Sequence, residues 1–581
     1  MHYTVKFQTL MDMLIYQAGK RPDKISHCYL AGGETKGREF CFEYLNDYAA
    51  KVAALLQGNE AWGKRALLFY PAGLDFVAAF FGCLYAGVVA VPTYPPRFHR
   101  TLPDRLLLRL RAVSKDSGPA FVLTTARMLD KKENLFREAP EFENMRWLAT
   151  DELSDELKSR WKRPDISGNT VAFLQYTSGS TSLPKGVMVS HENLLHNIAY
   201  ISHAQKNDND SVSVSWLPGY HDMGLIDAII QPAYVGFTSY LMSPVSFIQK
   251  PLRWLKAVSD YRATSSGGPN FAFDLCNRKI SAEEREQLDL SSLRFLYNGA
   301  EPVRKKVLET FYNNYKAYGL KLSSLNPVYG MAEATLMISS SIPSEEPVFI
   351  RLNADALKKN RVVESNDETV EAVSLVGCGK VFFGMEACIV NPKNRALCAD
   401  DEIGEIWVSG PSVTKGYWRN SEYTDETFNA YPANSTKGPY LRTGDLGFIR
   451  NGQVFITGRI KDLIIIRGRN YYPQDIECAV ENSALQSLRQ NASAAFTVDI
   501  NDEERLIIVT EVKRQFSKKG TLPDKTGTIR KIRNDVSYSF QVNVYDVVLI
   551  KATSLPKTSS GKVRRRDTKR LYLEKKLVRL P

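Results

Sequence analysis

A loop rich in small hydroxyl residues is the part of the sequence best suited to chemistry. It spans residues 176–186 (YTSGSTSLPKG), directly after an apolar run that predicts a strand and shortly before a predicted helix. Backbone N–H groups and Ser/Thr hydroxyls of such a loop converge on phosphate oxygens, and Lys185 adds a positive charge. The chain contains no Gly-Lys-Ser or Gly-Lys-Thr, which excludes a Walker A loop. The pattern predicts phosphate binding, with a flexible surface turn as the alternative.

Six further short motifs bring charged, aromatic and imidazole side chains to predicted turns. They are residues 216–224 (WLPGYHDMG), 298–302 (NGAEP), 329–333 (YGMAE), 442–445 (RTGD), 458–462 (GRIKD) and 556–562 (PKTSSGK). Ligands of α/β sheets bind where strands end, and an acid on a tight turn, such as Asp445, suits paired hydroxyl groups. Each motif alone has an ordinary alternative: His221 as a core histidine, Tyr329 as packing, and Asp445 or Glu301 as simple turn acids. Lys562 has the alternative of being one solvated charge in a basic tail.

Composition and charge restrict the kind of protein. The chain has 581 residues, of which 44% are hydrophobic and 24% charged, the balance of a folded globular protein. This composition excludes collagen, a coiled coil and wholesale disorder. The net charge of +12 suggests a polyanionic partner, but residues 556–581 hold ten Lys and Arg against two acids, so this tail alone carries +8. The rest of the chain is a nearly neutral body of enzyme size.

The cysteines and the apolar runs favour a cytoplasmic protein. None of the eight cysteines forms a Cys-x-x-Cys pair, and the N-terminus (MHYTVKFQTL) lacks the basic and apolar regions of a signal peptide. The longest apolar run, residues 76–91, is too short for a bilayer-spanning helix and contains Gly82 and Gly87. It predicts a buried helix that stops at Gly87, then a short strand over 88–91. No membrane-spanning segment is expected.

Short apolar strands and longer amphipathic helices alternate over about the first 450 residues, and these elements must position the motifs. A helix is predicted over 193–201, with Ser190 as its N-cap. Strands are predicted at 66–70, 88–91, 121–124, 171–176, 211–216 and 293–297. This alternation favours an α/β fold with mainly parallel sheets, here a large multi-layer N-terminal domain of residues 1–458.

A smaller α+β domain of about 120 residues is predicted from residue 459 to residue 581. One helix begins with Pro473 in its first turn, and a second carries an apolar stripe at 529, 532, 536 and 540. Strands are predicted at 462–467, 494–500, 506–512 and 547–551. The basic tail, with Lys562, therefore belongs to this smaller domain.

The motifs, in this order and at this spacing, resemble the adenylate-forming superfamily of acyl-CoA synthetases, luciferase-like enzymes and peptide synthetase adenylation domains. The resemblance covers nearly the whole chain. Residues 176–191 (YTSGSTSLPKGVMVSH), 216–226 (WLPGYHDMGLI) and 468–477 (GRNYYPQDIE) are most similar to fatty acyl-AMP ligases. These enzymes use ATP to activate a fatty acid as its adenylate and pass the acyl group to an acyl carrier protein. The resemblance implies a large α/β domain with a small, mobile α+β domain.

The resemblance also implies which residues bind the nucleotide. The ATP phosphates are assigned to Thr177, Ser178, Gly179, Ser180, Thr181 and Lys185. The adenosine is assigned to Gly299, Ala300, Glu301, Tyr329, Gly330, Met331, Asp445 and Arg459. Within this set Tyr329 stacks on the base, and Asp445 binds the ribose hydroxyls with help from Arg459.

The remaining implied roles concern the reaction. Glu333 ligates Mg²⁺, and Lys562 is the mobile catalytic lysine that bridges the substrate carboxylate and the phosphate. Lys461 is the hinge about which the small domain rotates, and His221 shapes the junction of acyl chain and adenylate. This set fits the chemistry, because attack of a fatty carboxylate on the α-phosphorus brings anions together and needs positioning and charge neutralisation more than acid–base catalysis.

Two features depart from the superfamily pattern. Ser182 stands where most members have a glycine, which affects the approach of that backbone to phosphate. Residues 343–373 form a long, polar link before the next strand. Fatty acyl-AMP ligases carry an extra segment in this region, thought to hinder the domain movement that coenzyme A needs; an ordinary surface excursion is the alternative.

Two other functions remain open. One is a long-chain fatty acyl-CoA synthetase; the other is a non-catalytic nucleotide- or nucleic-acid-binding protein that uses the basic tail. No nucleic-acid module is recognisable, so no nucleic-acid partner is expected. The expected partner is an acyl carrier protein of the polyketide or peptide synthetase type. Carrier proteins are typically acidic, so Arg564, Arg565 and Arg566 are expected to steer one in.

Overall fold

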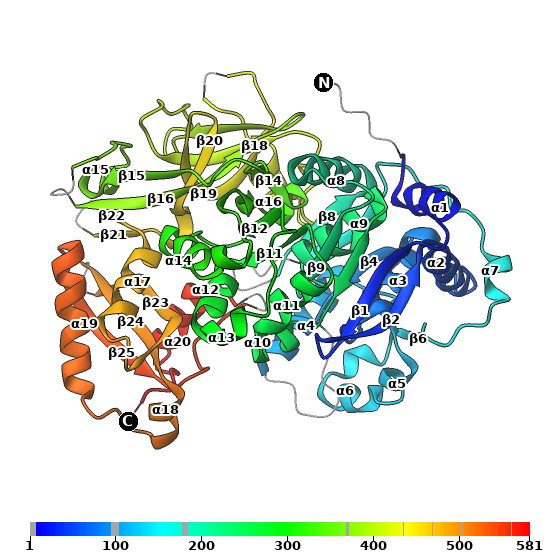
Figure 1. The fold of residues 1–581 in the computed structure, drawn as a ribbon, viewed down its shortest axis with the longest axis horizontal. Helices are drawn as coiled ribbons and strands as arrows, with labels where there is room; N and C mark the ends of the chain where they lie inside the picture. Colours follow the sequence, from blue (N-terminus) through cyan, green and yellow to red (C-terminus); the bar gives the residue numbers. More distant parts are fainter. Residues whose placement is uncertain are drawn as a thin grey trace.

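Four β-sheets organise the described part of the chain in this computed structural model (Figure 1). The structure describes residues 7–94, 104–176, 184–367, 371–433, 435–466, 469–500, 503–558 and 561–580. The largest sheet has 14 strands. In spatial order they are β17 (Glu386–Val390), β18 (Gly404–Ser409), β19 (Leu441–Arg450), β20 (Gln453–Arg459), β16 (Ala372–Lys380), β14 (Met337–Ser340), β13 (Leu325–Gly330), β12 (Phe295–Gly299), β11 (Ser265–Pro269), β9 (Val212–Ser215), β10 (Thr238–Leu241), β1 (Ile25–Ala31) and β2 (Thr35–Cys41), with β15 (Phe349–Asn353) beside β16.

Strand pairing in the large sheet changes from parallel to antiparallel at β13. From β1 through β10, β9, β11 and β12 to β13 the pairs are parallel, as the sequence predicts, but from β13 to β17 they are antiparallel. The turn between β19 and β20 explains part of this difference. Asn451 and Gly452 both have positive φ, of 52° and 76°, which is the two-residue turn that joins antiparallel strands. The prediction of mainly parallel sheets is therefore right for only half of this sheet.

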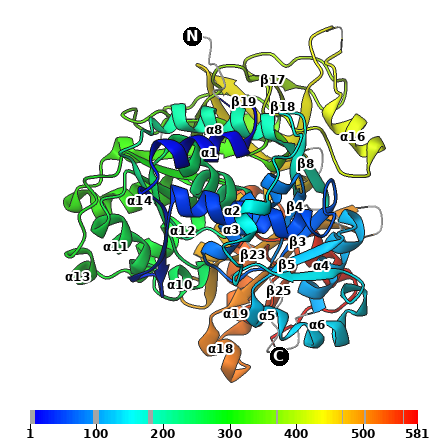
Figure 2. The same cartoon turned by 90° about the vertical axis from the view of Figure 1, so that its right-hand side faces the viewer.

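The second sheet is mostly parallel and is covered by helices. Its strands are β6 (Arg146–Ala149), β5 (Phe121–Thr124), β3 (Arg65–Leu68), β4 (Val89–Pro92), β7 (Val171–Tyr176) and the antiparallel β8 (Gly186–Ser190). The predicted buried helix is α3 (Leu74–Ala86), and it ends at Gly87 with φ 68°. Figure 2 shows α3 with α2 (Phe42–Gln57) in one layer and α1 (Leu10–Lys20) and α8 (His191–Gln205) above it. In the described ranges, no helix combines the length and hydropathy needed to cross a bilayer.

Helix α8 follows β8 directly and begins at the predicted cap. Ser190 caps it as predicted, because the Ser190 hydroxyl accepts from the Asn193 N–H while the Asn193 side chain accepts from the Ser190 N–H. Ser190 faces Val171 of β7, whereas the loop that joins β7 to β8 follows Tyr176, at the other end of this strand pair. The loop residues Thr177, Ser178, Gly179, Ser180, Thr181 and Ser182 lie outside the described residues.

The C-terminal part contains a two-stranded and a three-stranded sheet. The strands are β21 (Ile464–Ile466), β22 (Arg469–Tyr471), β23 (Leu488–Ile500), β24 (Glu503–Val512) and β25 (Val544–Ile550). Helices α17 (Pro473–Ser483) and α19 (Lys525–Phe540) bury Ile476 and Ile532 against one face of the three-stranded sheet. Helix α20 (Arg565–Leu573) covers the other face, where Tyr572 meets Phe496. The mixed α/β class, with a large N-terminal and a smaller α+β C-terminal region, is confirmed.

The long polar link contains structured elements. After residue 343 come β15, which pairs with β16, and the short helix α15 (Ala354–Lys358). Leu352 and Leu357 join one apolar cluster with Phe448 of the large sheet and Tyr472 of the C-terminal part. Asn470 also donates from Nδ2 to Asn360 Oδ1 at 2.9 Å. The link thus packs against both parts of the molecule.

Candidate active site

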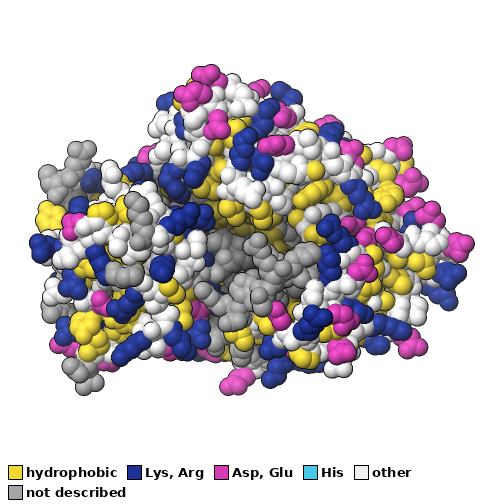
Figure 3. All heavy atoms as spheres, turned by 90° about the horizontal axis from the view of Figure 1, so that it is seen from below, with side chains coloured by type: hydrophobic (Ala, Val, Ile, Leu, Met, Phe, Trp, Pro, Cys, Tyr) yellow, Lys and Arg dark blue, Asp and Glu magenta, His cyan; other side chains and the backbone are white. Residues whose placement is uncertain are grey.

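A cavity of about 780 Å³ lies where the C-terminal part faces the large sheet. Figure 3 shows the face hollowed there, with Lys and Arg side chains around the rim. Most of the predicted site residues that the structure describes line it: Lys185, His221, Ala300, Glu301, Tyr329, Gly330, Met331, Glu333, Asp445, Arg459, Lys461 and Lys562. Gly299 does not line the cavity, because it packs against Val328. Side chains more than 370 residues apart in sequence therefore converge on one space.

Asp445 is the centre of a hydrogen-bonded group on the wall of the cavity. It lies on β19 directly opposite Arg459 on β20. Tyr329 Oη donates to Asp445 Oδ2 at 2.8 Å, and Arg459 Nε donates to Asp445 Oδ1 at 2.7 Å. Burial holds the pKa of Tyr329 well above 10, so its hydroxyl remains a donor. A carboxylate held in this way keeps acceptor capacity for further donors, such as a diol.

Asp445→Ala is expected to raise the KM for ATP by about tenfold to a hundredfold, the loss of about 1.5–3 kcal/mol for a hydrogen bond to a charged group. The substitution removes the acceptor and leaves Arg459 without its carboxylate. Steady-state kinetics with varied ATP measure the effect. Asp425→Ala, on α16 (Ser421–Phe428) and outside the cavity lining, is the matched control. An unchanged KM would show that Asp445 does not contact the nucleotide.

Glu333 is a buried carboxyl suited to one metal ion. It lies in a single 3₁₀ turn, Ala332–Ala334, and accepts from Tyr417 Oη at 2.9 Å. Burial raises its pKa, so a nearby cation would favour the charged form. Across the described ranges no group of three His, Cys, Asp or Glu side chains is placed to hold a metal. The geometry fits Mg²⁺, which binds through one or two carboxylates and substrate phosphates.

A stack of two lysines and a tyrosine lies beside Glu333. The Lys185 ammonium sits 3.0 Å from the ring centroid of Tyr423 and 5.0 Å from that of Tyr417. Lys461 Nζ donates to Tyr423 Oη at 2.9 Å. The two cations lower the pKa of Tyr423, with the Lys461 hydrogen bond as the largest cause. One aromatic ring therefore contacts both the phosphate-loop lysine and the predicted hinge lysine.

Tyr423→Phe is expected to remove the hydrogen bond from Lys461 and to keep the ring contact with Lys185, because only the hydroxyl is lost. Acyl-adenylate formation should change less than threefold, while proteolysis near residue 461 should accelerate at least threefold. Tyr423→Ala, which removes both contacts, should also lower adenylate formation. Equal proteolysis rates in the wild type and in Tyr423→Phe would contradict the contact between Tyr423 and Lys461.

Lys562 enters the cavity on a tight loop. The Thr558 N–H donates to the Lys562 carbonyl at 2.8 Å, and the Lys562 N–H donates to Thr558 Oγ1 at 3.0 Å. Gly561 has φ 86°, and a Cβ there would lie 3.3 Å from the Phe271 ring, so glycine fits this turn best. Burial and the Arg459 charge lower the pKa of Lys562. A bound polyanion would reverse that effect.

His221 and Glu301 contribute less directly. His221 Nδ1 lies 2.6 Å from Asp222 Oδ1. Burial alone would raise the pKa of Asp222, but the interaction with His221 lowers it. Glu301 accepts from the Phe271 N–H at 2.6 Å and so holds the start of α12 (Asn270–Lys279). Glu301 therefore contacts the backbone of another element, and this contact is not the local turn-acid role named as its alternative.

Sequence reasoning missed Tyr417, Tyr423 and Asp222. The two tyrosines reach Glu333 and Lys185 through the loop before α16 and through α16 itself, a contact that no local spacing signals. Asp222 is adjacent to His221 in a motif that was recognised, and that adjacency was the available signal.

Comparisons with known proteins identify the family of this chain. The AMP-binding enzyme family matches residues 14–418, and the AMP domain of Disco-interacting protein 2-like proteins matches residues 461–580. The chain belongs to the AMP-binding enzyme family.

Individual relatives match over nearly the full length. The chain is 45% identical to the medium-chain fatty acid–acyl-carrier-protein ligase JamA of Moorena producens, covering 98% of this chain and 96% of that protein. It is 34% identical to the long-chain fatty acid–AMP ligase FadD32 of Mycolicibacterium smegmatis, covering 95% and 92%. A fatty acyl-adenylate ligase from L. pneumophila, solved with acyl adenylate and pyrophosphate, has a TM-score of 0.76 at 38% identity and covers 99% and 98%.

Proposed function

We propose that the protein is a fatty acyl-AMP ligase that uses ATP to convert a fatty acid into its acyl-adenylate and pyrophosphate, then transfers the acyl group to an acyl carrier protein. The observation that carries the proposal is that Lys562 reaches the same cavity as Asp445 and Glu333. The relatives named as fatty acid–AMP and acyl-carrier-protein ligases support the substrate class.

The reaction requires little proton transfer. A carboxylate oxygen of the fatty acid attacks the α-phosphorus, and the bond to the pyrophosphate oxygen breaks. Lys562 neutralises the charge where the two anions meet, while Tyr329 and Asp445 fix the adenosine. Mg²⁺ held by Glu333 supplies charge stabilisation on the phosphates when it is bound. Catalysis then derives from orientation and electrostatics.

The second half-reaction needs the C-terminal part to move. We place the boundary between residues 458 and 459 and the hinge at Lys461, whose ammonium contacts Tyr423. In the present arrangement Lys562 lines the cavity, which corresponds to adenylate formation. Rotation about Lys461 would withdraw Lys562 and open the adenylate to a carrier thiol. Since all eight cysteines are unpaired, we propose a reducing, cytoplasmic location.

The carrier protein is expected to approach through the basic tail, although the structure changes which residues serve. Arg565 pairs with Glu477 and Asp462 and is only 19% exposed, so the expectation that it steers a partner is wrong. Arg564 pairs with Asp567. Arg566 is exposed and is the arginine of this group that best fits an acidic surface.

Pyrophosphate release with ATP, Mg²⁺ and fatty acids of 6 to about 16 carbons, checked against acyl-AMP by mass spectrometry, tests the proposal. Acyl-AMP should form and should transfer to a phosphopantetheinylated carrier protein. Efficient acyl-coenzyme A production would favour the acyl-CoA synthetase alternative. No pyrophosphate with any acid would contradict adenylation itself.

A further inference from the structure

A buried polar cluster around Asp227, close to His221 in the sequence, lines the cavity, and the mechanism above does not use it. Asp227, Gln205 and Tyr297 are 8%, 1% and 4% exposed, and all three line the cavity. They come from three separate elements: the π-helix Met223–Ile230, the end of α8, and β12. Asp227 lies in the buried helix that follows His221, so a fatty acid that extends from the expected junction at His221 along this helix would meet the cluster.

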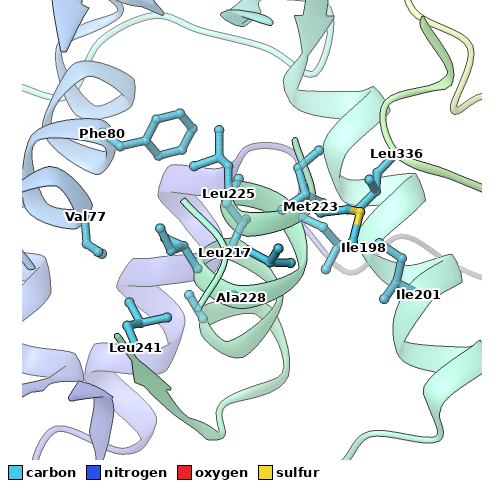
Figure 4. Close-up of a cluster of buried hydrophobic side chains, with 14 of the residues drawn as sticks. Val77, Phe80, Ile198, Ile201, Leu217, Met223, Leu225, Ala228, Leu241 and Leu336 are labelled. Carbon is cyan, nitrogen blue, oxygen red and sulfur yellow. The ribbon is translucent and has the colours of Figure 1, made fainter. Parts of the chain in front are cut away.

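The π-helix presents two contrasting side chains to this space. Met223 and Asp227, four residues apart, both line the cavity, whereas Leu225 and Ile229 are buried without lining it. A π-helix has about 4.4 residues per turn, so positions four apart share a face. Figure 4 shows Met223 turned toward Ile198 and Leu336, away from Leu225 and Phe80. The wall is apolar at Met223 and Leu336 and becomes polar at Asp227.

Neighbouring side chains fix the Asp227 carboxylate in place. Gln205 Nε2 donates to Asp227 Oδ1 at 2.7 Å. The Gln205 amide cannot turn round, because its Oε1 accepts from Asn207 Nδ2 at 2.7 Å and from Gln231 Nε2 at 3.2 Å. The Tyr297 hydroxyl lies close enough to Asp227 to favour the charged form of the carboxyl and so to act against the rise in its pKa. Neither partner of Asp227 is cationic, and burial raises the pKa of Asp227 to about 6.

This arrangement has a consequence for the chain that fills the cavity. A carboxylate offers about four acceptor sites, and two donors leave part of that capacity unused. A methyl-terminated chain that reaches Asp227 would strip water from the carboxylate and return no hydrogen bond. A hydroxyl at the same place would donate to it.

We propose that Asp227, oriented by Gln205 and Tyr297, is a specificity-determining residue that ends the acyl chamber with a hydrogen-bond acceptor and so rejects methyl-terminated chains long enough to reach it. The inference rests on the proposed function and adds the substrate class. Acids that stop short of Asp227, or that bring a hydroxyl to it, are the preferred substrates.

The experiment compares kcat/KM for saturated acids of increasing length, and for their ω-hydroxy counterparts, in the wild type and in Asp227→Leu. In the wild type, kcat/KM should fall at least tenfold once the methyl end reaches Asp227. At that length the ω-hydroxy acid should be used at least fivefold better than its methyl match. Asp227→Leu, of similar size but apolar, should abolish the fall and reverse the preference for hydroxyl. Asp260→Leu, an exposed acid outside the cavity lining, should behave as the wild type.

Two results would overturn the inference. One is a chain-length profile of kcat/KM for Asp227→Leu that is identical to that of the wild type. If only Asp227→Ala accepted longer acids, the size of the side chain, and not its polarity, would set the chain-length limit. The other is equal use of hydroxy and methyl acids by the wild type, a comparison that holds even if the variants do not fold. Absence of acyl-AMP with every acid would instead contradict the proposed function.

Discussion

Lys562→Ala is expected to lower the rate of acyl-adenylate formation by about 10²–10³-fold, the cost of removing one preorganised stabilising group from a reaction that depends on charge neutralisation. Lys562 lines the cavity near the carboxylates of Asp222, Glu301 and Asp445. The affinity for ATP should change little, because Tyr329, Asp445 and Arg459 are untouched. Pyrophosphate release measures the first quantity and isothermal titration calorimetry the second.

The control for this prediction comes from the same tail. Lys569→Ala removes an equal charge from α20, outside the cavity lining, and should retain near wild-type turnover. If Lys562→Ala turned over normally, Lys562 would not be the catalytic lysine. If both variants lost activity equally, the effect would belong to the charge of the tail as a whole.

Arg565→Met is expected to destabilise the C-terminal part by about 3–5 kcal/mol, the cost of removing one partner of a buried ion pair. Arg565 Nε and Nη2 donate to Glu477 at 2.7 and 2.8 Å, and Nη1 donates to Asp462 at 3.0 Å. The substitution leaves the Glu477 side chain, 7% exposed, without a counter-charge. Adenylate formation should also fall, because Arg565 ties the start of α20 to the turn that contains Lys461.

Urea unfolding followed by far-ultraviolet circular dichroism measures the loss of stability. Arg566→Met removes the neighbouring, exposed arginine and should change stability by less than about 0.5 kcal/mol. Double substitution of Arg565 and Glu477 by methionine and leucine should recover part of the loss, because both charges are then absent. A midpoint for Arg565→Met equal to that of the wild type would show that the pair contributes nothing.

Local sequence patterns predicted many of the helices and strands well. They could not predict which residues far apart in the sequence come together in the fold. The strands 121–124 and 171–176 match β5 and β7 because short buried runs follow local hydrophobicity. The cap at Ser190 and the stop at Gly87 are likewise local effects. The antiparallel half of the large sheet was missed even though Asn451-Gly452 is a hairpin signal visible in the sequence.

The site was reached through a resemblance of motifs, whereas the contacts within it depend on packing. Nothing in the spacing of residues 417, 423 and 461 shows that Tyr423 lies between two lysines. Arg565 pairs with Glu477, 88 residues earlier in the chain. In the sequence Arg565 resembles a surface charge, but in the structure this ion pair is largely buried. Buried partners of charged residues are set by the fold and have no periodic signature.

The apolar cluster of Leu352, Leu357, Phe448 and Tyr472 has a consequence for folding. Its members come from the long link, the large sheet and the C-terminal part, so this cluster is complete only when all three pack together. Their stabilities are therefore thermodynamically linked, and loss of Tyr472 packing is felt in the large sheet. If the C-terminal part rotates about Lys461 as proposed, this contact would be broken and remade in each catalytic cycle. The turnover rate and the unfolding of this part of the molecule would then depend on the same side chains.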